Sequence, residues 1–143
     1  MRMQNSQANC GPTAVQNGLV ALGLTRSIDE LEKLLGCTAT QGTSGPKMLK
    51  GLYHIEELQP RKIEESREEI AHLRLDAALR SGRPVILCVD NLEHYVCAIG
   101  RLGTSRVIIA DSADSELVLV YTWSEAMRRW ESQSKKAYWG LVL

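Results

Sequence analysis

The sequence predicts an α+β fold, in which helices from the first half of the chain pack on an antiparallel sheet formed by the second half. Two observations support this fold class. Apolar residues recur at helical spacing between residues 12 and 80, whereas short runs rich in Val, Ile, Leu and Tyr follow one another between residues 84 and 143. A chain of 143 residues is long enough for one sizeable core and too short for two, so we expect residues 1–143 to form a single domain.

Helices are expected in four segments of the first half: residues 12–22, 28–35, 46–52 and 64–80. A Pro suits the first turn of the first helix, and Ser27 to Glu30 has the pattern of a capping box at the start of the second. Residues 53–62 are ambiguous, with an irregular strand ending at Pro60 as one interpretation. We expect these side chains of the last two helices to face inward: Leu49, Leu52, Ile70, Leu73, Ala77 and Ala78.

Strands are expected in five segments of the second half, because each is short, apolar and rich in β-branched residues. They cover residues 84–90, 94–100, 107–111, 117–121 and 137–143. A short helix from about Ser124 to Trp130 interrupts the last two. In chain order these segments predict an antiparallel meander, with the functional site where the N-terminal helix meets the sheet.

Composition narrows the classes of partner. Seventeen basic and seventeen acidic residues cancel, so no overall field favours nucleic acid or an anionic membrane, and we interpret the pairs Arg128-Arg129 and Lys135-Lys136 as solvated surface. No stretch is apolar over the length needed to cross a bilayer, and the N-terminal residues lack the apolar core of a signal peptide. The four cysteines lack paired spacing, so we expect no disulfide framework and a cytoplasmic location.

Cys10 is the strongest candidate for chemistry. It precedes Gly11 and a helix that starts near Pro12, and a helix N-terminus favours the thiolate, which is the nucleophilic form of cysteine. Gly11 would also let a substrate approach the backbone closely. The alternative interpretation is a buried structural thiol, which is the usual role of an unpaired cysteine.

His94 and Asp111 are expected to lie side by side on neighbouring strands. If a tight hairpin sets residue 100 opposite residue 105, His94 lies opposite Asp111, with Cβ atoms about 5 Å apart. The carboxylate would then orient the imidazole and stabilise its protonated form, as the third member of a catalytic triad with Cys10 must. The alternatives are a half-exposed strand residue for His94 and a turn residue for Asp111.

Four other residues are weaker candidates for this chemistry. Asp90 and Asp114 are the fallback partners of His94, should Asp111 be misplaced. His72 lies in a charged helix and His54 in the ambiguous segment, and no pattern places a carboxylate against either of them.

Acyl transfer also needs hydrogen-bond donors for the oxyanion of the tetrahedral intermediate. The backbone N–H of Cys10 can supply one donor. The side-chain amide of Gln4 or of Gln7 can supply a second. The alternative interpretation, from their position near the N-terminus, is that both residues belong to a solvated terminal segment.

Metal and nucleotide sites find little support. Cys88, His94 and Cys97 lack the paired spacing of a zinc site, and both cysteines suit the interiors of apolar strands. Residues 42–45 are not followed by the Lys and the Ser or Thr of a phosphate-binding loop. We therefore expect neither a metal nor a cofactor.

Taken together, these residues and their surroundings resemble the bacteriocin-processing (double-glycine leader) peptidase family and its peptidase-like relatives, which are small papain-like domains. The resemblance covers most of the chain, and Asp111 follows His94 by seventeen residues. The segments that carry it are Gln4, residues 9–14, 42–44, 79–87 and 94–100, Asp111, Trp130 and residues 138–140.

The resemblance implies a papain-like cysteine peptidase in which Cys10 is the nucleophile, His94 the general base and acid, Asp111 the orienting carboxylate and Gln4 the oxyanion donor. It also implies a peptide or protein substrate that is cleaved through a thioester acyl-enzyme without a cofactor. Two alternatives stay open. One is acyl transfer to an amine, as in phytochelatin-synthase-like relatives with a similar Cys-Gly-Pro start, and the other is a peptide-binding module that does no chemistry.

Overall fold

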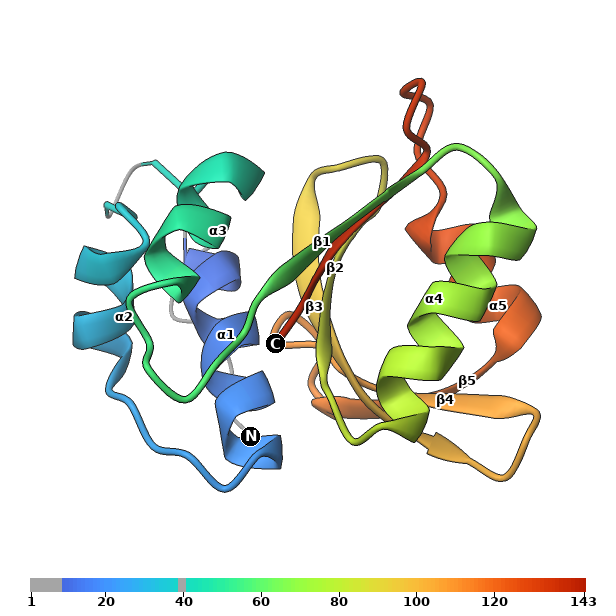
Figure 1. The fold of residues 1–143 in the computed structure, drawn as a ribbon, viewed down its shortest axis with the longest axis horizontal. Coiled ribbons are helices and arrows are strands. Elements are labelled where there is room, and N and C mark those ends of the chain that lie inside the picture. Colours follow the sequence, from blue (N-terminus) through green and yellow to red (C-terminus); the bar gives the residue numbers. More distant parts are fainter. Residues whose placement is uncertain (1–8, 39–40) are drawn as a thin grey trace.

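Three helices lie on one side of a six-stranded sheet and two on the other (Figure 1). This arrangement comes from a computed structural model that describes residues 9–38 and 41–143. The helices are α1 (Cys10–Ala21), α2 (Ile28–Leu34), α3 (Gly45–Leu52), α4 (Glu68–Arg80) and α5 (Trp123–Trp130). The strands are β1 (Arg61–Glu65), β2 (Val85–Val89), β3 (His94–Leu102), β4 (Arg106–Ala110), β5 (Val118–Thr122) and β6 (Tyr138–Val142). The molecule therefore has the α+β architecture that the sequence predicts.

The strands pair antiparallel in the order β1-β6-β2-β3-β4-β5. Strands β2 to β5 form the predicted meander. Strand β6, however, returns to the middle of the sheet and pairs with both β1 and β2, so a meander alone was an incomplete prediction. The order of strands along the chain does not reveal where a last strand inserts, because that depends on pairing with segments far away in sequence.

Strand β1 is the element that the sequence analysis missed. Its residues are mostly charged and only Ile63 is buried, which hides an edge strand inside a stretch of helix-like composition. The predicted helix from residue 64 is correspondingly wrong at its start, since α4 begins at Glu68.

The buried face of α4 also differs from the prediction. Its buried residues are Ala71, Leu75, Ala78 and Leu79, which are spaced as one helical face. Of the predicted inward residues only Ala78 belongs to this face, whereas Leu73 is 65% exposed, Ala77 is exposed and Ile70 is half-buried. The apolar positions of this helix fit two overlapping faces, and packing against the sheet selects one of them.

The short helices α2 and α3 agree better with the sequence. The Ser27 hydroxyl accepts a hydrogen bond of 3.1 Å from the Glu30 N–H, which caps α2 and is one of the two hydrogen bonds of the predicted capping box. In α3, Leu52 is buried as predicted, but the other buried residues are Met48 and Gly51, and Leu49 is half-buried.

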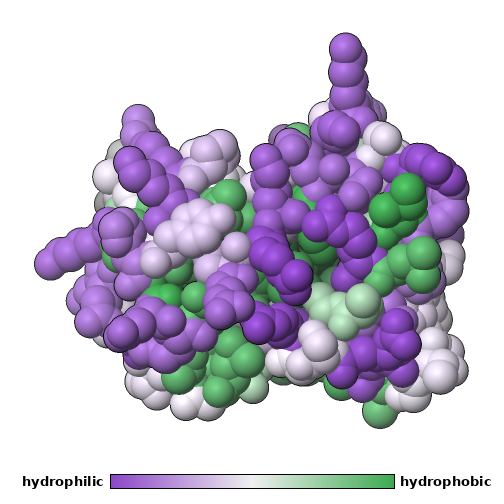
Figure 2. All heavy atoms as spheres, viewed as in Figure 1, coloured by the Kyte–Doolittle hydropathy of each residue, from purple (hydrophilic) through white to green (hydrophobic). Residues whose placement is uncertain are grey.

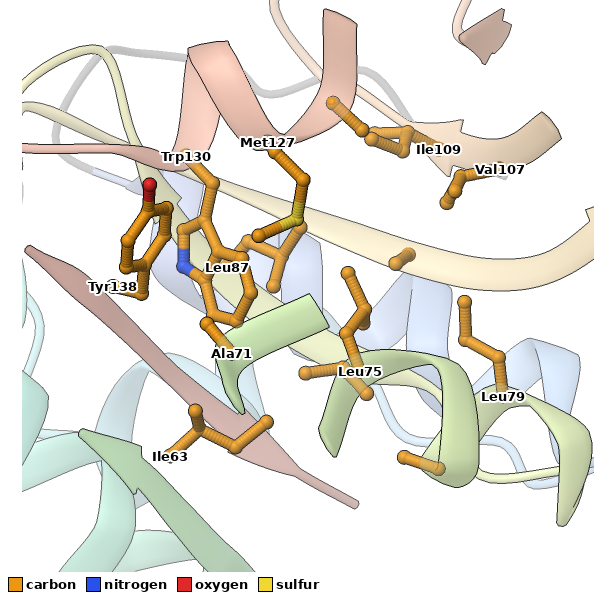
Figure 3. Close-up of a cluster of buried hydrophobic side chains, with 14 of the residues drawn as sticks. Ile63, Ala71, Leu75, Leu79, Leu87, Val107, Ile109, Met127, Trp130 and Tyr138 are labelled. Carbon is orange, nitrogen blue, oxygen red and sulfur yellow. The ribbon is translucent and has the colours of Figure 1, made fainter. Parts of the chain in front are cut away.

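Both faces of the sheet are covered, so the molecule has two apolar clusters. Strand β2 is buried along its whole length, as is typical of a strand packed on both faces. Ile86 belongs to the cluster beneath α1, α2 and α3, while Leu87 belongs to the cluster beneath α4 and α5. Figure 3 shows this second cluster, in which Leu75 of α4 and Trp130 of α5 approach the sheet.

We predict that Gly140→Ala destabilises the fold by about 1–3 kcal/mol, the usual range for overpacking. An added Cβ would lie 2.6 Å from the Ile86 carbonyl oxygen, so β6 would have to move away from β2. Gly100→Ala is the matched control, because its Cβ would meet only an Ile108 methyl at 3.9 Å. Urea unfolding followed by tryptophan fluorescence measures both variants, and equal midpoints would contradict the prediction.

Candidate active site

Cys10 is the first residue of α1, so its backbone N–H has no acceptor within the helix. The residue as a whole is 8% exposed. The neighbouring Gly11 makes room for the segment before α3, because a Cβ there would lie 2.5 Å from Cγ2 of Thr43 and 3.0 Å from Cε of Met48. Thr43 is itself anchored, since its hydroxyl donates a 2.6 Å hydrogen bond to the Leu35 carbonyl. Packing therefore fixes the backbone around the thiol.

His94 and Asp111 form a short, buried pair. His94 begins β3, Asp111 follows β4, and the imidazole Nε2 lies 2.7 Å from Oδ1 of the carboxylate. The exposed fractions of the two side chains are 13% and 5%. The same Oδ1 accepts a 3.1 Å hydrogen bond from the Ala113 N–H. Because Asp111 occupies Nε2, Nδ1 is the ring nitrogen left for Cys10.

The pair forms through a register that differs from the predicted one. The β3–β4 ladder sets Gly100 opposite Ile108, and a β-bulge next to Gly100 then shifts the register by one residue. Continued to the end of β4, this register places Asp111 opposite Val96, which is on the same face as His94 and two residues from it. The predicted direct opposition of His94 and Asp111 is wrong by two residues, but a diagonal pair on one face is still within reach.

The thiol of Cys10 is in hydrogen-bonding contact with His94. Burial alone would raise the pKa of this thiol, but hydrogen bonds from His94 and from the backbone N–H of Tyr95 outweigh burial, and the pKa is lowered. The positive charge of the imidazolium and the backbone N–H of Gly11 act in the same direction. The environment therefore favours a thiolate.

The pKa of His94 is raised, whereas that of Cys10 is lowered. Burial lowers the pKa of the imidazole, whereas hydrogen bonds and negative charge from Asp111 and Cys10 raise it, and the balance puts the pKa of His94 at about 9. Burial by itself would raise the pKa of Asp111, but hydrogen bonds from His94, the Ala113 N–H and Arg129 hold it well below its usual range. The surroundings therefore favour the thiolate of Cys10, the imidazolium of His94 and the carboxylate of Asp111.

Arg129 is a site residue that the sequence analysis missed. We interpreted the pair Arg128-Arg129 as solvated surface, yet Nη1 of Arg129 lies 2.8 Å from Oδ2 of Asp111 and its side chain is only 21% exposed. Arg129 stands next to the buried Trp130 on α5, at the edge of the face that packs on the sheet. Its adjacency to a buried tryptophan was the available signal in the sequence.

The structure gives three of the weaker candidates partners other than the His94 imidazole. Asp90 pairs with Arg129, with two contacts of 3.0 Å, and Asp114 accepts a hydrogen bond from the Glu116 N–H. His72 stacks on Trp123 of α5 at a centroid distance of 4.2 Å. His54 is exposed beyond the end of α3 and lines a separate depression.

Gln4 and Gln7 lie outside the described residues, so the expected oxyanion role stays a prediction. Cys88 and Cys97 are buried in strands, as expected, and the four cysteines are all free thiols. In residues 9–38 and 41–143, no group of three His, Cys, Asp or Glu side chains is placed to hold a metal ion. The same residues include no helix with the length and apolar character of a membrane span.

Among the comparisons with known proteins, a family model shows the family and the solved structures show the fold. The model of a family described as "Peptidase_C39 like family" matches residues 1–138. No curated protein matches the chain at a significant level.

Among solved structures, the peptidase domain of Streptococcus ComA, described as a bi-functional ABC transporter involved in a quorum sensing pathway, is similar with a TM-score of 0.74 at 19% identity. That match covers 98% of this chain and 93% of the other. A putative C39-like peptidase from Bacillus anthracis has a TM-score of 0.71 at 12% identity, covering 100% and 93% of the two chains. The peptidase domain of Streptococcus mutans ComA has a TM-score of 0.61 at 14% identity, covering 99% and 95%. These likenesses confirm the predicted papain-like fold.

We predict that iodoacetamide labels Cys10 faster than an ordinary thiol at pH 6, because a lowered pKa leaves a larger fraction of the thiol ionised at a given pH. Labelling of Cys88 should be far slower, since burial raises its pKa to about 12. As pH rises through the pKa of His94, about 9, the imidazolium is lost and the advantage of Cys10 over an ordinary thiol disappears. Peptide mass spectrometry of each cysteine against pH measures these rates.

His94→Ala should slow the labelling of Cys10 at pH 6 by about tenfold or more, since a shift of one pKa unit changes the thiolate fraction tenfold. His72→Ala is the control, because His72 stacks on Trp123 rather than on this site. Unchanged labelling of Cys10 in His94→Ala would contradict the prediction.

Proposed function

Because this chain belongs to the Peptidase_C39 like family, we propose that it is a cysteine peptidase that hydrolyses a peptide or protein substrate with Cys10, His94 and Asp111. The observation that carries the proposal is the buried 2.7 Å contact between His94 and Asp111, together with the hydrogen bond between the Cys10 thiol and the same imidazole. A nucleophile, a base and a group that orients the base are what acyl transfer through a covalent intermediate requires. The family and the fold support the peptidase assignment in general, and the residue roles are the proposal.

In the acylation step, the thiolate of Cys10 attacks the carbonyl carbon of the scissile peptide bond. A C–S bond forms, and the π electrons of the carbonyl move onto its oxygen. As the tetrahedral intermediate collapses, the C–N bond breaks and His94 transfers its Nδ1 proton to the departing amine. The products of this step are a thioester on Cys10, a free amine and a neutral imidazole held by Asp111.

In the deacylation step, water attacks the thioester carbon. Neutral His94 takes a proton from that water, and the second tetrahedral intermediate then releases Cys10 as a thiolate and the substrate as a carboxylic acid. This step restores the imidazolium–thiolate pair. Asp111 stays ionised throughout, because its pKa lies far below neutral pH.

The oxyanion of both intermediates needs donors near Cys10. The free N–H at the start of α1 is one, and the partial positive charge of the helix N-terminus adds to it. We propose the amide of Gln4 as the second, on the strength of the family resemblance.

A peptide substrate would lie in two depressions that meet at Trp139. One, of about 330 Å³, lies between α3 and strands β1 and β6, and the other, of about 350 Å³, lies between Leu92 and the segment before β6. Trp139 and Glu64 line both. Trp139 also packs edge-on against Tyr95, at a centroid distance of 6.5 Å, and Tyr95 directly follows His94. In Figure 2 the surface dips between the helical half and the sheet half of the molecule at the top of the view.

The two depressions are alike in character. Apolar side chains of α3 and β6 line the first, Leu92 and Trp139 line the second, and each also contains two lysines and Glu64. This combination suits an extended peptide that carries apolar side chains. Four free thiols, one of them activated, fit a reducing compartment, so we propose the cytoplasm as the location.

We predict that the protein cleaves members of a synthetic peptide library and that Cys10→Ala abolishes the cleavage while keeping the thermal stability of the fold. Cys37→Ala is the matched control, since Cys37 is a half-buried thiol near Cys10 whose pKa is raised by burial, Glu32 and Cys10. Mass spectrometry of the products measures both variants. Persistent cleavage by Cys10→Ala would rule out the proposal.

The same experiment separates the two other functions that the sequence leaves open. Products that carry an added amine, when a free amine is supplied, would indicate acyl transfer. Library peptides that bind without being cleaved would indicate a binding module instead of an enzyme.

We predict that Gln4→Ala lowers kcat by about 10²–10³-fold with little change in KM, because an oxyanion donor acts mainly in the transition state. Gln7→Ala should leave kcat within about twofold. Steady-state kinetics on the best library peptide measures both, and equal effects of the two substitutions would exclude the assigned role of Gln4.

A further inference from the structure

We propose that Arg129 is a positioning residue, which fixes the Asp111 carboxylate against His94 and joins it to the turn that leads into His94. The inference rests on the proposed function, in which Asp111 orients His94. The two oxygens of Asp111 have separate partners: Oδ1 lies 2.7 Å from Nε2 of His94, and Oδ2 lies 2.8 Å from Nη1 of Arg129. The carboxylate cannot rotate toward another orientation without breaking one of these contacts.

The second role of Arg129 concerns the turn between β2 and β3. Its Nε and Nη2 each lie 3.0 Å from a different carboxylate oxygen of Asp90, and its own carbonyl accepts a 3.2 Å hydrogen bond from the Asp90 N–H. Arg129 thus holds Asp90 through both its side chain and its backbone. A bidentate pair of this kind fixes orientation as well as distance.

That turn needs to be held, because its backbone is unusual. Asp90, Asn91 and Leu92 have φ angles of 54°, 58° and 69°. Asp and Asn tolerate this left-handed region, but Leu rarely adopts it. His94 begins β3 two residues after Leu92, so any relaxation of the turn would move the imidazole.

The guanidinium is well fixed itself. Its Nη1 also lies 3.0 Å from the Tyr121 hydroxyl of β5, which accepts a hydrogen bond from it. The helix that carries it is anchored by buried side chains of Ala126, Met127 and Trp130. Arg129 therefore joins α5, β5, the end of β4 and the turn before β3 at one point.

Other titratable groups lie around the His94–Asp111 pair. Cys10 of α1 contacts His94, and Cys88 of β2 and Tyr95 of β3 lie close by, both kept neutral because burial raises the pKa of each. Cys37, beyond α2, interacts with Cys10, and its pKa is also raised, by burial, Glu32 and Cys10. Among these groups Arg129 is the fixed cation that faces Asp111, so its removal should be visible in the titration of that carboxyl.

The test compares wild-type protein with Arg129→Gln by two measurements. The first is the ¹³C NMR titration of the Asp111 carboxyl, whose acid dissociation constant should fall about tenfold or more when the cation is removed from a buried carboxylate. The second is the labelling of Cys10 by iodoacetamide, which should slow about tenfold at pH 6 and recover near pH 9, where a thiol ionises unaided. A purely structural role would slow labelling equally at both pH values.

Arg101→Gln is the matched control. Arg101 makes a 2.7 Å contact with Asp76 and its side chain is 23% exposed, but it lies seven residues along β3 from His94, about 20 Å away. We expect both measurements to match wild type in this variant. Arg129→Lys keeps the charge but cannot reach both carboxylates, so it should fall short of wild type in the labelling of Cys10 at pH 6.

Three results would overturn the inference: a folded Arg129→Gln with wild-type titration and labelling, an Arg129→Lys that equals wild type in both, or a control that shifts as much as Arg129→Gln. Should Arg129→Gln fail to fold, Asp90→Asn takes its place. Asn tolerates the left-handed backbone, and the substitution weakens the contact between Arg129 and the turn before β3. Smaller shifts in the same directions would support the inference, whereas the absence of any shift would contradict it. Slow labelling of Cys10 in wild type would sink the proposed function, while the Asp111 titration would still decide the role of Arg129.

Discussion

The candidate site depends on the close approach of α1 to the sheet, because α1 carries the thiol of Cys10 and β3 of the sheet carries the imidazole of His94. Gly18 permits this approach: a Cβ there would lie 2.5 Å from Cδ1 of Leu143 and 3.1 Å from Sγ of Cys97. Residues eight positions apart share a helix face, so Cys10 and Gly18 both point toward the sheet. Cys97 lies three residues after His94 on β3. The glycine in α1 thus sets how near the thiol comes to the strand that carries the histidine.

Burial and pairing act against each other at this site, and pairing wins for all three reactive groups. Desolvation alone disfavours the charged form of each group, which is the thiolate of Cys10, the imidazolium of His94 and the carboxylate of Asp111. Each group instead stabilises the charged form of its neighbour, and Arg129 supplies a further cation at the far oxygen of Asp111. The charges therefore depend on geometry, so the turn before His94 and the end of β4 contribute to the electrostatics of the candidate site as well as to the fold.

The β-bulge next to Gly100 shows how far local rules reach. From the hairpin alone, His94 and Asp111 were expected to be direct neighbours, and the observed turn by itself would have put them on opposite faces of the sheet, since a register shift of one residue reverses the face. The bulge adds one residue to β3 and restores the shared face. A correct pair was therefore predicted from an incorrect register, because the turn and the bulge compensate for each other.

The sequence by itself determined the fold class, most strands and the position of Cys10 at a helix start, because these follow from local periodicity and capping. It also led to the pairing of His94 with Asp111, but only because the turn and the bulge compensate for each other. Tertiary structure alone decided the strand β1, the insertion of β6 between β1 and β2, the buried face of α4 and the place of Arg129. Each of these depends on partners distant in the chain. From the sequence, Arg129 was interpreted as a surface residue, because its partners are not near it in the chain. Folding brings the carboxylates of Asp111 and Asp90 to it from positions 18 and 39 residues earlier in the sequence.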